Sequence, residues 1–179
     1  PKREMPWFTR RGGTVYGTDG HEGRAEVCAW DLASGEVRPL CTVPDAGQFH
    51  VNLTASGKIV AVNMYGVFFR FDAASGALEL SRVLPTDAIG RVDCIVRAGK
   101  DRLVGTPFIT QRFWEVDLKR REGRDCGRAA PGGGEILQTW QLGKKVYMAA
   151  YTGGELMEYD PLRPANFPEN PRVVADAPH

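Results

Sequence analysis

Apolar and polar positions alternate in short runs along the chain, and the clearest example is residues 66–84. The aromatic side chains of Phe68, Phe69 and Phe71 favour a strand. Ser75-Gly76 is a turn signal, and the apolar pattern resumes over residues 78–83. The pattern therefore predicts a β-hairpin that reverses near Ser75-Gly76.

Three other segments repeat this pattern, at residues 27–43, 113–129 and 156–175. In all four an aspartate ends the first strand of the hairpin, at spacings of 41, 45 and 43 residues. These aspartates are Asp31, Asp72, Asp117 and Asp160. A period of about 40 to 50 residues made only of strands is typical of propeller blades.

The repeat predicts an all-β fold, a β-propeller with four repeats of a four-stranded antiparallel blade. The blades cover about residues 5–43, 48–84, 91–129 and 135–177 of a single propeller domain or segment, residues 1–179. The predicted strands are 6–10, 14–18, 26–31, 37–43, 49–54, 58–64, 67–72, 78–83, 92–97, 102–106, 112–117, 124–128, 136–142, 145–151, 155–160 and 172–175.

Composition narrows the function classes. Among 179 residues, 21 glycines and 12 prolines suit many short strands joined by turns. A net charge of +1 with interspersed signs argues against a nucleic-acid partner. The sequence contains no apolar run of transmembrane length, so no membrane association is predicted. Residues 1–5 do not start a signal peptide, and the compartment stays open.

The four cysteines are predicted to be free thiols that are buried or half-buried. Cys28 and Cys41 flank one hairpin turn symmetrically, and a bridge between them is sterically feasible. Cys94 and Cys126 fall on the first and last strands of one blade, so no bridge is expected there. No C-x-x-C pattern occurs, which argues against a zinc or thioredoxin-type site.

The chain resembles the PQQ, YVTN and Kelch-like group of bacterial β-propellers. The resemblance is carried by the turn Ser56-Gly57-Lys58, by residues 66–72 with Ser75-Gly76, and by residues 145–147 and 154–161. It covers nearly the whole chain and implies blade architecture rather than an activity. The tryptophan pattern of PQQ enzymes and the Gly-His partner of a WD dipeptide are not evident.

Such propellers more often have six to eight blades. The resemblance therefore favours a segment of a larger ring over a closed ring of four blades. The apolar flanks of the first and last blades would then meet missing blades or a second copy of the chain.

In propellers, the loops that join successive blades and the loops between the second and third strands of each blade share one face, called the loop face below. Loops on a rigid scaffold commonly carry function. Candidate catalytic residues there are His21 and His50. Candidate ligand-binding residues are Arg112, Tyr65, Tyr151, Gln111 and Asp93.

Two functions follow from these residues. The first is a binding module for a small molecule, a saccharide or a protein. The second is a carbohydrate-active enzyme of the polysaccharide-lyase type, with His21 or His50 as acid and base and Arg112 holding a carboxylate. The alternative to a catalytic role is structural. His21 would then be a solvated turn residue, and His50 would be a hydrogen-bonded residue of the central channel of the propeller.

The remaining motifs predict no cofactor and no metal. Residues 131–134 are rich in glycine, but neither a helix nor a Lys-Ser/Thr pair follows, so they indicate a turn rather than a phosphate site. The charged run at residues 119–124 is expected to be a solvated turn on the outer rim. Arg124→Ala is accordingly expected to change almost nothing.

Overall fold

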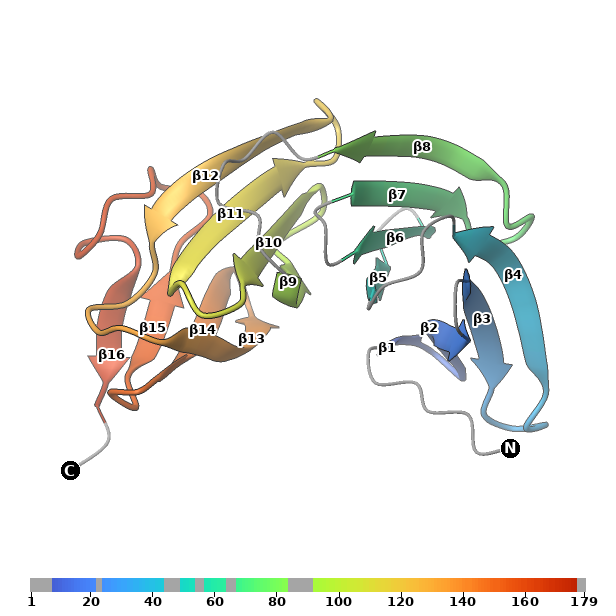
Figure 1. The fold of residues 1–179 in the computed structure, drawn as a ribbon, viewed down its shortest axis with the longest axis horizontal. Coiled ribbons are helices and arrows are strands. Elements are labelled where there is room, and N and C mark those ends of the chain that lie inside the picture. Colours follow the sequence, from blue (N-terminus) through green and yellow to red (C-terminus); the bar gives the residue numbers. More distant parts are fainter. Residues whose placement is uncertain are drawn as a thin grey trace. The chain divides into compact units, whose positions relative to one another are not determined.

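The computed structural model describes residues 8–21, 24–43, 49–53, 57–63, 67–83 and 92–176. Every regular element in these ranges is a strand, and the strands form four sheets (Figure 1). Blade 1 contains β1 (Phe8–Arg11), β2 (Thr14–His21), β3 (Arg24–Asp31) and β4 (Val37–Val43). Blade 2 contains β5 (Phe49–Leu53), β6 (Lys58–Asn63), β7 (Val67–Asp72) and β8 (Leu78–Val83). Blade 3 contains β9 (Val92–Arg97), β10 (Arg102–Pro107), β11 (Arg112–Asp117) and β12 (Glu122–Arg128). Blade 4 contains β13 (Glu135–Leu142), β14 (Lys145–Tyr151), β15 (Leu156–Tyr159) and β16 (Arg172–Ala175).

Each sheet has four strands in sequence order, and each neighbouring pair is antiparallel. The architecture is therefore that of β-propeller blades, which confirms the predicted fold class. Several strands have the predicted bounds, including β7, β8, β9 and β11. Within the described residues the chain contains no helix that is long and apolar enough to cross a membrane.

The chain divides into two compact units, residues 1–83 and 84–179. The first unit holds blades 1 and 2, whose inner strands β1 and β2 contact β5. Its core is a cluster of buried side chains contributed by both blades. The buried members are Val27, Ile59, Phe69 and Phe71.

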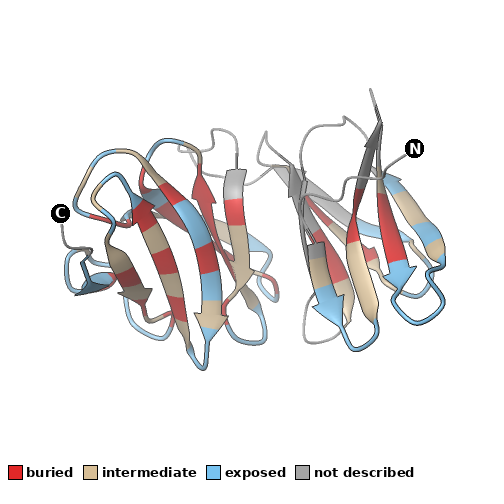
Figure 2. Ribbon diagram, turned by 90° about the horizontal axis from the view of Figure 1, so that it is seen from below, coloured by how far each residue is buried: buried red, intermediate tan, exposed pale blue. Residues whose placement is uncertain are grey.

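The second unit holds blades 3 and 4, and its core is larger. Side chains alternate between buried and half-buried along β14, as the red and tan bands of this unit show in Figure 2. The ring of Phe113 meets Tyr159 of the next blade edge to face, with 4.8 Å between the ring centres. Such aromatic pairs add to the stability that apolar burial provides.

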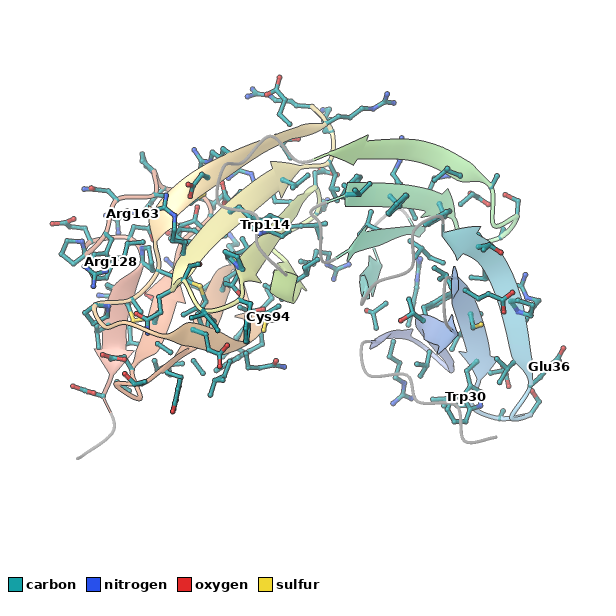
Figure 3. The ribbon with its side chains drawn as sticks, in the orientation of Figure 1. Trp30, Glu36, Cys94, Trp114, Arg128 and Arg163 are labelled. Atoms are coloured by element: carbon teal, nitrogen blue, oxygen red, sulfur yellow. The ribbon has the colours of Figure 1, made fainter. Side chains whose placement is uncertain are left out.

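Gly105 allows the largest core side chain to lie flat on blade 3. It pairs with Trp114 across β10 and β11, and Trp114 is fully buried (Figure 3). A Cβ at Gly105 would lie 2.0 Å from Trp114 Cζ2. Any side chain at this position would therefore displace the indole from the core.

The four repeated aspartates occupy equivalent positions, as predicted. Asp31, Asp72 and Asp117 end the third strand of their blades, and Asp160 directly follows β15. In each turn Oδ1 accepts a hydrogen bond from the backbone N–H two residues later. This is an Asx-turn, which a short carboxylate side chain forms without any help from the rest of the protein.

All four cysteines are thiols. Cys94 lies on β9 and Cys126 on β12, the two edges of the blade 3 sheet, which confirms the prediction that they are not bridged. Cys28 and Cys41, for which the sequence left a bridge possible, do not pair directly across the hairpin. A bulge in β3 places Val27 opposite Cys41 and moves Cys28 opposite Pro39.

Candidate functional site

The loop face of the second unit is formed by three segments. They are residues 107–111 between β10 and β11, residues 129–134 between β12 and β13, and residues 151–155 between β14 and β15. Antiparallel pairing brings them to the same end of their sheets. The predicted residues Gln111, Arg112 and Tyr151 all belong to this face.

Gln111 connects all three segments. Its side-chain Nε2 donates a 2.6 Å hydrogen bond to the carbonyl oxygen of Tyr151. Its own carbonyl oxygen accepts a 2.7 Å hydrogen bond from the N–H of Ala129. Its backbone is left-handed, with φ of 43°, and its side chain is buried. A non-glycine residue in this conformation is uncommon, and such residues are frequent at functional sites.

Glycines bring the three segments close together. Gly134 has a φ of 116°, and a Cβ there would lie 2.3 Å from the Tyr151 carbonyl oxygen. The Thr152 N–H donates to the Gly133 carbonyl oxygen over 3.3 Å. The glycine-rich run that the sequence indicated as a turn therefore packs against the backbone of the segment at residues 151–155.

Three acceptor oxygens at this end of the sheets receive no hydrogen bond from the described residues. They are Gln111 Oε1, Glu155 Oε2 and Oε2 of Glu135, which follows Gly134 and pairs with Tyr151. A Cβ at Gly132 would lie 3.7 Å from Gln111 Oε1 and 3.9 Å from Glu155 Oε1, so both side chains border the same glycine. A Cβ at Gly153 would lie 2.2 Å from Glu155 Oε1. The carboxylate is therefore enclosed by glycine backbone.

The two arginines of the face already have partners. Arg112 is half-exposed and forms an ion pair with Asp125 of the neighbouring strand β12. Arg128 donates to the carbonyl oxygens of Ala130, Pro131 and Gly132, and its guanidinium lies 5.6 Å from the ring centre of Phe167 (Figure 3). Arg128 thereby fixes the loop that contains the glycines.

The same segments carry two exposed apolar side chains. Tyr151 is 52% exposed and Ile109 is 60% exposed. Ile109 is also left-handed, with φ of 61°. Large exposed apolar groups next to enclosed polar atoms are characteristic of binding surfaces.

The roles of all seven predicted site residues stay predictions, and the side chains of four of them are not described by the structure. His21 ends β2 and His50 lies in β5, both in the first unit, while Asp93 lies in β9 of the second. Their side chains, and all of Tyr65, lie outside the described residues. Within the described part of the chain, no three His, Cys, Asp or Glu side chains are placed to hold a metal ion.

Sequence reasoning missed Glu155 and Arg128. The signal for Glu155 was its place directly after Gly153-Gly154, because glycines next to a carboxylate permit close backbone approach. Arg128 had no comparable signal, since its partners are backbone carbonyls of the loop that follows it.

A second polar cluster lies at the other end of blade 3. Glu115 is buried, and its carboxylate accepts hydrogen bonds from Arg124 at 2.5 Å and 2.9 Å. The Tyr159 hydroxyl of blade 4 donates to it over 2.7 Å. Arg102 Nη1 lies 3.8 Å from Glu115 Oε1. A cavity of about 170 Å³ borders this cluster.

This cluster corrects the prediction that Arg124 is an inert rim residue. Arg124 is the main counter-charge of a buried carboxylate, and although burial opposes its charge, Glu115 raises the pKa of its guanidinium. Burial, followed by the charge of Glu115, raises the pKa of the Tyr159 phenol. The same two causes raise the pKa of the Cys126 thiol to about 12. The strand register, rather than local charge, determines these contacts.

The comparisons with known proteins support the fold. No family model matches the chain, and no curated protein matches it in sequence. The WD40 domain of Neurospora crassa Pan2 is similar in structure, with a TM-score of 0.65 and 13% identity over 97% of this chain and 52% of that one. The structure of YCF48 bound to D1 peptide gives a TM-score of 0.64 and 13% identity over 92% and 51%. A chain of the mitotic checkpoint complex gives 0.64 and 13% over 92% and 46%.

These similarities show that the chain has a propeller architecture, and at these identities they extend no further than the fold. The chain spans about half the length of the structures that it matches.

Proposed function

We propose that this chain is a protein-binding β-propeller module that receives a peptide segment of its partner on the loop face of the second unit. The observation that carries the proposal is the convergence of three loops on Gln111, because these loops hold buried acceptors without hydrogen bonds and also carry the exposed side chains of Tyr151 and Ile109. An extended peptide offers both apolar side chains and hydrogen-bond donors to such a surface.

The structural neighbours support this class of function. YCF48 is described as bound to D1 peptide, and another neighbour belongs to the mitotic checkpoint complex, an assembly of proteins. A rigid blade scaffold with short loops needs little rearrangement to bind an extended segment.

Selection from a random peptide display library against the whole chain tests the proposal. We expect selected peptides to bind with micromolar dissociation constants, and Tyr151→Ala to weaken them at least tenfold. Leu162→Ala is the matched control, because Leu162 is a 77% exposed side chain of the same unit, in the turn that follows β15. Equal losses for the two variants, or a library that yields no binder, would contradict the proposal.

A further inference from the structure

We infer that the loop face of the second unit recognises a basic side chain, an arginine guanidinium or a lysine ammonium, through Gln111 Oε1 and the Glu155 carboxylate. These two groups are called the acceptor pair below. The inference rests on the proposed function, because it names the chemistry that the bound peptide presents to this face.

The orientation of the Gln111 amide is fixed by its surroundings. Its nitrogen donates to the Tyr151 carbonyl oxygen over 2.6 Å, and the opposite orientation would place two oxygens against each other. The amide oxygen is therefore left as an acceptor, on a side chain that is 2% exposed. No described residue donates to it.

The Glu155 carboxylate lies next to the same glycine, Gly132, as the Gln111 amide oxygen, and Gly153 backs it without a side chain. No ion pair or hydrogen bond from a described residue reaches its Oε2 atom. A buried acceptor that stays unpaired costs about 1–3 kcal/mol, so a ligand that donates hydrogen bonds here recovers this cost on binding.

The charges favour a cation over an anion. Arg112 is neutralised by Asp125, and Arg128 donates to three loop carbonyls, so the two arginines of this face among the described residues are engaged. Among the described residues, this end of the sheets thus offers the Gln111 oxygen and the carboxylates of Glu155 and Glu135 as acceptors. The exposed ring of Tyr151 provides a surface for the aliphatic stem of a long basic side chain.

An NMR titration of the whole isotope-labelled chain tests this inference with small probes. The probes are the N-acetyl methylamides of arginine, lysine and citrulline; citrulline has the length and shape of arginine without its charge. We expect arginine, lysine or both to shift the amide signals of Gly132, Gly133 and Gly153. Citrulline should bind at least tenfold more weakly, a difference of about 1.4 kcal/mol.

Variants locate the effect. Glu155→Gln should lower the affinity for the basic probes at least tenfold and leave citrulline binding unchanged. Glu122→Gln is the matched control, because it removes the same charge from an exposed position at the far end of blade 3. The comparison of the three probes on the unaltered chain does not depend on whether any variant folds.

Equal binding of arginine and citrulline, or an equal loss for Glu155→Gln and Glu122→Gln, would overturn the inference. Selected peptides that bind the loop face without a basic residue would also overturn it while the proposed function stands. A display library without binders would instead count against the proposed function, and the probe titration would still decide the chemistry of the acceptor pair.

Discussion

Gly76 of blade 2 lies directly against the backbone of Leu40 in blade 1. A Cβ at Gly76 would come within 1.9 Å of the Leu40 carbonyl oxygen. Gly35 has the same position in the turn of blade 1 and nearly the same φ, 73° against 71°, but no atom lies within 4 Å of its would-be Cβ. Both positions therefore favour glycine because of the positive φ, but only Gly76 also requires it for close packing.

We expect Gly35→Ala to lower the free energy of unfolding by about 1–2 kcal/mol, the cost of a left-handed backbone for a residue with a Cβ. Gly76→Ala should lose this amount and about 1–3 kcal/mol more, because the backbone of β4 must move. Urea denaturation of both variants measures the difference. Equal losses would show that the Leu40 contact relaxes without cost.

The bond between Tyr159 and Glu115 should contribute more than an equivalent bond nearer the surface. Tyr159→Phe removes a donor from a buried carboxylate, and we expect a loss of about 1.5–3 kcal/mol in the free energy of unfolding. Tyr147→Phe is the control, since Tyr147 donates over 2.9 Å to the more accessible Glu158. A loss for Tyr147→Phe as large as that for Tyr159→Phe would contradict this reasoning.

Arg124→Ala should destabilise the second unit by about 1–3 kcal/mol, because it leaves the buried Glu115 carboxylate short of its main counter-charge. The half-exposed position of Arg124 keeps the expected value below that of a fully buried pair. Arg120→Ala, four residues earlier on an exposed turn, should stay within about 0.5 kcal/mol of the parent chain. Thermal denaturation of the two variants decides whether the charged run is inert.

Asp72 should make the stability of the first unit depend on pH in the acid range. Its hydrogen bond with Lys58, and then those with Ser75, hold the pKa of its carboxyl below the ordinary value of 3.8. A carboxyl with a lowered pKa in the folded state stabilises that state above its unfolded pKa, and the contribution disappears as pH falls through the folded pKa. We therefore expect stability to fall as the pH drops below about 4.

Lys58→Met tests this expectation, because it removes the main cause of the lowered pKa. Its urea midpoint should change less between pH 5 and pH 2 than that of the parent chain. Lys144→Met removes the same charge from an exposed turn and should keep the parental acid dependence. A Lys58→Met variant with the parental profile would show that other groups cause the acid response.

Local pattern was enough to predict the strands, because each hairpin carries its own turn signal. The aspartate turns illustrate this, since their side-chain bonds span only two or three residues. The expectation for Arg124 was wrong for the opposite reason. Its partner Glu115 is reached through strand pairing, and its role depends on burial by blade 4, which no local pattern reports.

The positions of the candidate residues in the fold followed from the sequence only in part, for a similar reason. Placing Gln111 and Tyr151 on one loop face required only the strand order. Their direct hydrogen bond depends on the left-handed backbone of Gln111, which is a property of the folded loop and not of a glutamine in sequence. The ion pair of Arg112 with Asp125 depends on a bulge between Phe113 and Trp114, which shifts the register of β12.

The aspartate turns also bear on the order in which the chain folds. The bonds that close the turn at Asp31, from Ser34 to its side chain and from Gly35 to its carbonyl oxygen, lie within five residues, as do the corresponding bonds from Ser75 and Gly76 to Asp72. Hairpins of this size form in about 1–10 μs, well before contacts between distant residues. Each outer hairpin can thus nucleate its own blade, and the slow step becomes the docking of one blade on the next.

Insertion or duplication of a whole repeat would leave that nucleus intact. Only the surfaces with which the new blade packs against its two neighbours would then have to become complementary again.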